Sequence, residues 1–101
     1  MKTYIVTFEK EGILDSFNYV SFHEKLTTAQ GVISWWHYLG TTYILSVPDT
    51  ATATSVTQYI LAIAPNKKFF VAKVDLKDHG GWLPKEAWDW INNQTSSWGY
   101  K

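Results

Sequence analysis

The chain has 101 residues, no cysteine, and nine lysines that balance nine aspartates and glutamates for a formal net charge of zero. This length indicates one domain, and the lack of cysteine excludes disulfide frameworks, thiolate metal sites and cysteine nucleophiles. Hydrophobic residues make up 46% and charged residues 18%, which excludes a disordered chain. A neutral balance without arginine disfavours a protein whose whole surface binds nucleic acid or membranes.

The N-terminal part of the chain predicts a strand followed by a helix. In residues 2–8 the side chains point alternately to two faces, with Tyr4, Val6 and Phe8 on one of them. The run is also rich in β-branched and aromatic residues, which indicates a strand. Residues 16–29 repeat apolar side chains at helical spacing, which predicts an amphipathic helix. We expect Asp15 or Ser16 to cap this helix and Gly31 to end it.

The rest of the chain predicts a hairpin, a helix, a strand and a last helix. Two aromatic and β-branched runs, residues 32–38 and 42–47, lie close enough in sequence to form a hairpin. The later elements are expected as a helix over residues 52–64, a strand over 68–76 and a helix over 84–93. In that strand, the side chains expected to face the two preceding helices are Phe70, Ala72, Val74 and Leu76.

These elements follow the order β-α-β-β-α-β, with one more helix at the end. Two right-handed crossings in this order interleave into one four-stranded antiparallel sheet with both helices on one face. We therefore expect an α+β, ferredoxin-like sandwich. It forms a single domain over residues 1–93, followed by a polar tail over residues 94–101.

The sheet face opposite the two helices is predicted to be apolar, although a face in water is normally polar. The side chains expected there are Ile5, Ile44, Phe69, Val71 and one of Trp35 and Trp36. The two tryptophans are adjacent, so they must point to opposite faces of the sheet.

Three coverings would hide this apolar face. The C-terminal helix could fold back over it with Trp88 and Trp90, or unpaired bases or a small aromatic ligand could stack on it. A second copy of the chain could instead pack sheet against sheet or extend an edge strand, and this is the covering we favour. The face then becomes the interface of a homodimer.

One stretch of the chain is locally basic, with aromatic residues between the lysines. Lys67, Lys68 and Lys73 flank Phe69 and Phe70, which is the composition of a nucleic-acid-binding face. Lysines at the entry to a strand also prevent unwanted pairing of its edge. The stretch therefore indicates either a contact with nucleic acid or a protected strand edge.

Candidate catalytic and metal-binding residues are few. Glu9, Glu11 and Asp15 follow the first strand, where carboxylates could hold Mg²⁺, although an acidic loop in water is the simpler interpretation. The three histidines stand far apart in sequence and lack the spacing of a zinc motif. We therefore expect no cofactor, apart from Mg²⁺ if Glu9 is catalytic.

The sequence gives no sign of a membrane partner. No window contains the roughly 18 apolar residues that a spanning helix needs. The first apolar run is also too short for the core of a secretion signal. We expect a cytoplasmic protein.

Four stretches of the chain resemble small bacterial proteins labelled SinR family. They begin at Tyr4 (YIVTF), Trp35 (WWHYL), Phe70 (FVAKV) and Gly81 (GWLPKEAW). Together with the order of elements, the resemblance covers most of residues 1–93, and WWHYL is its most specific run. These small proteins are in turn distantly similar to the small CRISPR adaptation nucleases and to virulence-associated protein D.

The resemblance to the nucleases implies a ferredoxin-like fold, a homodimer, and a divalent metal held by an aspartate of each subunit after the first strand. The matching position here is Glu9, whose side chain is one methylene longer. The favoured function is thus a non-catalytic, dimeric interaction module that contacts nucleic acid through Lys67, Lys68 and Lys73. The alternative is a Mg²⁺-dependent nuclease that uses Glu9 of both subunits.

Overall fold

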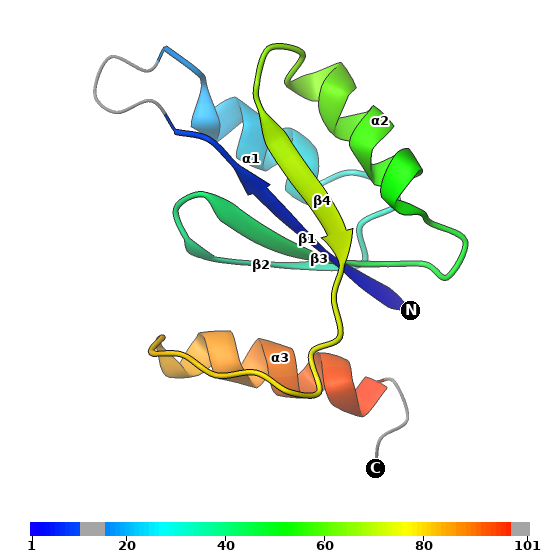
Figure 1. Cartoon of the computed structure of the whole chain (residues 1–101), viewed down its shortest axis with the longest axis vertical. Coiled ribbons are helices and arrows are strands. Elements are labelled where there is room, and N and C mark those ends of the chain that lie inside the picture. The colour runs from blue at the N-terminus through cyan, green and yellow to red at the C-terminus, as the bar shows by residue number, and fades with distance from the viewer. Residues whose placement is uncertain (11–15, 98–101) are drawn as a thin grey trace.

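The computed structural model describes residues 1–10 and 16–97, and these form four strands and three helices. In chain order the elements are β1 (Lys2–Phe8), α1 (Tyr19–Thr27), β2 (Ser34–Leu39), β3 (Thr42–Val47), α2 (Ala53–Ile63), β4 (Phe69–Lys73) and α3 (Lys85–Ser97). The predicted α+β class is confirmed. Figure 1 shows α1 and α2 on one side of the sheet and α3 on the other.

The sheet has the strand order β2-β3-β1-β4, and all of its pairs are antiparallel. This is the arrangement that two interleaved β-α-β units produce, so the ferredoxin-like topology predicted from the element order is confirmed. The central strand β1 pairs with β3 on one side and β4 on the other, with Val6 opposite both Tyr43 and Val71. Among the described residues, β2 and β4 are the edge strands.

The larger core lies between the sheet and the helices α1 and α2. Alternate residues of β1 and β3 point into it, as the period of two requires. Each helix adds an apolar stripe to the same layer. The buried members are Tyr4, Val6, Phe8, Phe22, Leu26, Tyr43, Leu45, Val47, Val56, Ile60 and Ala64.

The helix starts show which polar residues cap them. Asn18 caps α1, because its side-chain oxygen accepts a hydrogen bond from the backbone N–H of Ser21 over 3.0 Å. The expectation of Ser16 as the cap is therefore wrong, and Asp15 lies outside the described residues. At α2, Thr52 and Ser55 each bond the other's backbone N–H, which forms a capping box.

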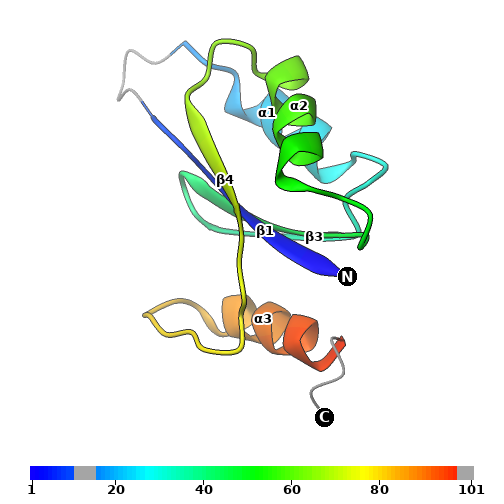
Figure 2. The ribbon, with the colours of Figure 1, turned by 45° about the vertical axis from the view of Figure 1, so that its right-hand side comes forward.

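A second, smaller core lies between α3 and the opposite face of the sheet (Figures 1 and 2). Its buried members are Trp36, Ile44, Leu76, Ala87 and Ile91, and Ile5, Val74, Leu83, Trp88 and Trp90 pack against them. The C-terminal helix therefore does fold back over the sheet, so this covering is confirmed. Ile44 and Trp36 are buried and Ile5 is partly buried by their own chain, which removes the reason to place a sheet-against-sheet interface on them.

Two residues assigned to this second face lie on the other one. Phe69 and Val71 pack against the larger core, while Val74 belongs with the smaller one. The cause is the register with β1, which puts Phe69 opposite Phe8 and Val71 opposite Val6 on the face covered by α1 and α2. Because this strand is apolar at successive positions, the period of two did not show which set faces inward.

The chain reaches α3 through an extended loop, in which Gly81 is the one described residue with a positive φ, at 151°. The helix then continues to Ser97, beyond the expected end at residue 93, and Gln94 on it is buried. No helix among the described residues combines the length and apolar character that crossing a membrane requires.

Candidate functional site

The strand β4 has one edge that no described strand pairs with. Its other edge bonds to β1: the N–H of Glu9 donates to the carbonyl of Lys68 over 3.1 Å, and the N–H of Val74 donates to the carbonyl of Thr3 over 3.0 Å. In an antiparallel ladder the backbone groups of successive residues point to opposite edges. The N–H and C=O groups of Phe69, Val71 and Lys73 therefore point to the free edge.

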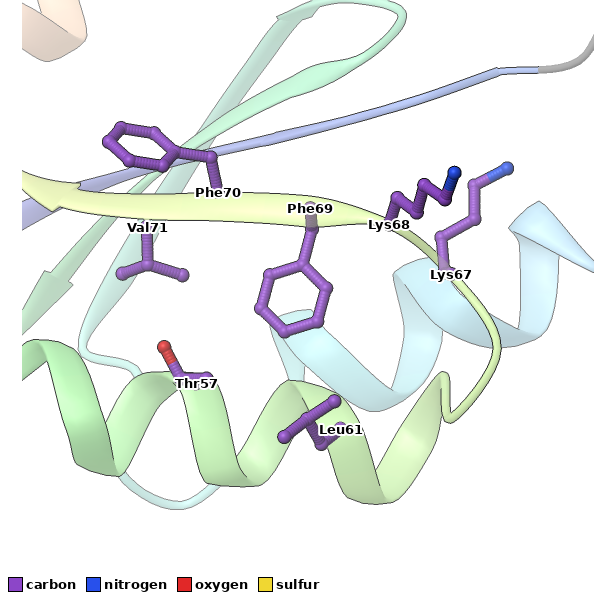
Figure 3. Close-up of a pocket in the computed structure, with 7 residues that line it drawn as sticks. All are labelled: Thr57, Leu61, Lys67, Lys68, Phe69, Phe70 and Val71. Carbon is purple, nitrogen blue, oxygen red and sulfur yellow. The ribbon is translucent and has the colours of Figure 1, made fainter.

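A hollow of about 510 Å³ lies beside this free edge, between β4 and α2 (Figure 3). Figure 3 shows Phe69 and Val71 pointing from β4 toward α2, whereas Phe70 points away from it. On the helix side, Thr57 and Leu61 line the hollow. The hollow therefore combines unpaired backbone groups with an apolar wall, which are the two features that a docked strand uses.

Large apolar side chains are exposed around this edge. Phe70 is 62% exposed and Leu61 is 47% exposed, and they lie on opposite sides of the strand. A lone exposed apolar residue is common in monomers, but here two of them border an unpaired strand edge. The edge of β4 is thus open to pairing with another strand.

The three lysines proposed for nucleic acid do not form one patch. The Nζ of Lys67 donates to the hydroxyl of Tyr19 over 2.6 Å and lies 4.9 Å from the ring centres of Phe17 and Tyr19. Lys68 is exposed beside it. Lys73 is at the far end of β4, about 17 Å from Lys68 at the usual rise of a strand.

Lys73 belongs to a different group of charges. The chain's amino group lies 2.7 Å from the Asp49 carboxylate, and this hydrogen-bonded ion pair holds the pKa of Asp49 below its usual range. Lys2 and Lys73 add smaller effects of the same sign. The lysines at the two ends of β4 therefore sit in separate electrostatic surroundings.

Glu9, the candidate metal ligand, is exposed at the end of β1. The two other acidic residues considered with it, Glu11 and Asp15, lie outside the described residues. Within residues 1–10 and 16–97, no three histidine, aspartate or glutamate side chains gather into a metal site. A site of this kind within one copy is thus not formed by the described part of the chain.

The structure assembles one cluster that the sequence did not predict. His23 of α1 and His37 of β2 both lie against Tyr43 of β3, with Trp35 edge-on to His23. The His37 ring is parallel to the Tyr43 ring at a centre-to-centre distance of 3.8 Å, and the centres of the two imidazoles are 5.8 Å apart. Burial raises the pKa of the Tyr43 phenol to about 12.

The two histidines are 14 positions apart on different elements, so no spacing rule links them. The sequence held one signal, which is the position of each histidine next to a buried residue. His23 directly follows Phe22, which is buried in the larger core. His37 directly follows Trp36, which is buried in the smaller core, so His37 points to the opposite face of the sheet. Whether the two histidines come close together depends on the register of the sheet, which only the fold supplies.

Comparisons with models of protein families, with curated proteins and with solved structures found no match to this chain.

Proposed function

We propose that this protein is a dimeric interaction module in which the free edges of β4 from two copies pair antiparallel. The observation that carries this proposal is the edge of β4 that no described strand pairs with, beside an apolar hollow. Pairing of two edges around a twofold axis continues the sheet across both copies and satisfies the exposed backbone groups. The expected homodimer therefore forms through the strand edge rather than through the sheet face.

The backbone directions select the register of this pairing. Phe69, Val71 and Lys73 carry the outward-pointing groups, so hydrogen-bonded pairs must join these residues with one another. The register centred on Val71 pairs Val71 with its own copy and Phe69 with the partner's Lys73. It also brings Lys67 opposite the partner's Asp75, which gives an attractive pair of charges at each end of the interface.

The two neighbouring registers are less favourable. A shift of two residues one way places Lys67 opposite the partner's Lys73, and a shift the other way places it opposite the partner's Lys77. Like charges directly opposite each other destabilise a pair of strands. Charge therefore disfavours both shifted registers.

The side chains around the edge support the same pairing. In this register Phe69 lies opposite a lysine, where the ammonium group and the aromatic ring attract each other. Leu61 and the hollow of each copy lie next to the partner's strand and lose their contact with water. Backbone bonds thus supply the affinity, and the hollow supplies the apolar contact.

The nuclease alternative requires a different dimer, because it brings Glu9 of both copies to one metal. In the edge-paired dimer, Glu9 lies at the level of Lys68, so the two copies of Glu9 are about 20 Å apart along the strand direction. The two functions therefore exclude each other in a single dimer. Activity on RNA or DNA that needs Mg²⁺ and is lost in Glu9→Ala would favour the nuclease.

The first test is the mass of the protein in solution by light scattering. Edge pairing predicts a mass of twice 11.6 kDa that falls toward 11.6 kDa in Val71→Pro. Proline removes the N–H at the centre of the free edge, and an unpaired edge tolerates proline. Val71→Thr is the control, because it keeps both the N–H and the β-branched shape, and it should remain dimeric.

A wild-type mass of 11.6 kDa at high concentration would refute the dimer. A dimer that persists in a folded Val71→Pro variant would place the interface elsewhere. Circular dichroism of the variant distinguishes loss of pairing from loss of fold.

A further inference from the structure

The pair His23 and His37 lies far from the β4 edge, on the part of the sheet formed by β2 and β3. The proposed function does not use it, and its two ring centres lie 5.8 Å apart although the histidines belong to a helix and a strand. Both imidazoles are only partly buried, so they are reachable from water. Tyr43, against which both rings pack, is 2% exposed and gives them a fixed support.

The hydrogen bonds determine which nitrogen of each imidazole carries the proton and which has a lone pair for a ligand. The Nδ1 of His37 lies 2.9 Å from the carbonyl oxygen of Thr42. A carbonyl only accepts, so Nδ1 carries the proton and the lone pair of a neutral ring is on Nε2. The Nδ1 of His23 lies 2.7 Å from the hydroxyl of Tyr43, whose oxygen can accept a hydrogen bond from Nδ1–H and so leave the lone pair of that ring on Nε2 as well.

This arrangement is the one found behind metal-bound histidines, which donate the other ring N–H to a carbonyl or another acceptor. The ring spacing agrees with it. A metal lies about 2.0–2.1 Å from a ligating nitrogen, so two rings on one ion have centres roughly 5–6.5 Å apart. The observed separation between the ring centres of His23 and His37 is 5.8 Å.

We propose that His23 and His37 bind one divalent transition-metal ion of the borderline class, such as Ni²⁺, Cu²⁺ or Zn²⁺, through their Nε2 atoms. Imidazole suits these ions, whereas Mg²⁺ and Ca²⁺ prefer oxygen ligands. The described residues bring no third histidine or carboxylate into the group, so water completes the coordination. The ion would join α1 to the edge strand β2.

The test uses Ni²⁺ as the probe and the full chain without an affinity tag. Isothermal titration should show one saturable site per chain. The affinity should fall about tenfold or more in both His23→Gln and His37→Gln. His79→Gln is the matched control, because His79 bonds the carbonyl of Leu76 and stacks on Trp88 away from the pair, and it should bind within about twofold of wild type.

A second measurement keeps the test valid if a glutamine variant folds poorly. In wild-type protein, paramagnetic Ni²⁺ should broaden the NMR signals of His23, His37 and Trp35 before those of His79. Equal affinity in all three variants, loss in only one of the two variants of the pair, or earliest broadening at His79 would overturn the proposal. The dimer test does not bear on this site, because the two features lie on opposite edges of the sheet.

Discussion

The indole Nε1 of Trp36 donates a hydrogen bond to the backbone carbonyl of Ala87 over 3.2 Å, and both residues are buried. The two residues are 51 positions apart, so this bond attaches α3 to the edge strand β2. The buried indole is one of the contacts that pack α3 against the sheet. Trp36, Ile44 and Ile91 are therefore buried within one chain on this side of the sheet, whereas Phe70 stays 62% exposed.

The adjacent tryptophans give a matched pair of substitutions. Trp36→Phe removes the buried N–H and part of the buried ring, so it should lower the free energy of unfolding by about 1–3 kcal/mol. Trp35→Phe changes a side chain that is 40% exposed, so the loss should stay below about 1 kcal/mol. Urea unfolding measures both, and equal losses would contradict the role assigned to α3.

The loop before α3 contains a second matched pair. Gly81 has a φ of 151°, and a Cβ there would lie 3.4 Å from the Cη2 of Trp88. Gly81→Ala should destabilise the protein by about 1–2 kcal/mol, because an L side chain rarely adopts this backbone conformation. A Cβ at Gly80 would meet no atom within 4 Å, so Gly80→Ala should be neutral or slightly stabilising. Thermal unfolding measures both variants. A larger loss of stability in Gly80→Ala than in Gly81→Ala would refute the strain assigned to Gly81.

Tyr43 predicts a loss of stability at alkaline pH. Its pKa is about 12 in the folded protein and 10.0 when unperturbed, because burial disfavours the phenolate. The unfolded chain releases this proton first, so stability is intact below pH 10 and falls by about 1–2 kcal/mol as the pH rises toward 12. Ultraviolet titration of the tyrosines together with unfolding measured at each pH tests this.

The control for that prediction is Tyr43→Phe, which keeps the ring stacked on His37 but has no proton to lose. Its stability should decline less steeply than that of wild type over the same pH range. Identical slopes in the two proteins would show that the Tyr43 phenol does not couple to folding.

Much of the fold follows from local patterns. The alternation in residues 2–8 and the short turn between Leu39 and Thr42 give β1 and the hairpin of β2 and β3, because period and turn length are local properties. The start of α1 was less predictable. Asn18, Ser16 and Asp15 are all good caps, and the choice among them depends on where the helix meets the sheet.

The predictions that failed concern features that depend on contacts between residues far apart in sequence. Both sets of alternate side chains in β4 are largely apolar, so only pairing with β1 decides that Phe69 and Val71 face α2. Likewise, one of the two adjacent tryptophans had to be buried, and α3 selects Trp36. The lysines illustrate the same limit, because Lys67 and Lys73 flank one strand in sequence but have different partners in space.

The most direct test of the edge-pairing proposal is amide hydrogen exchange along β4, measured by NMR at low and high protein concentration. The amides of Phe70 and Ala72 bond to β1 and should be protected at both concentrations. The amides of Phe69, Val71 and Lys73 point to the free edge, so pairing predicts that their exchange slows as the concentration rises. Fast exchange of these three amides at every concentration would contradict the proposal.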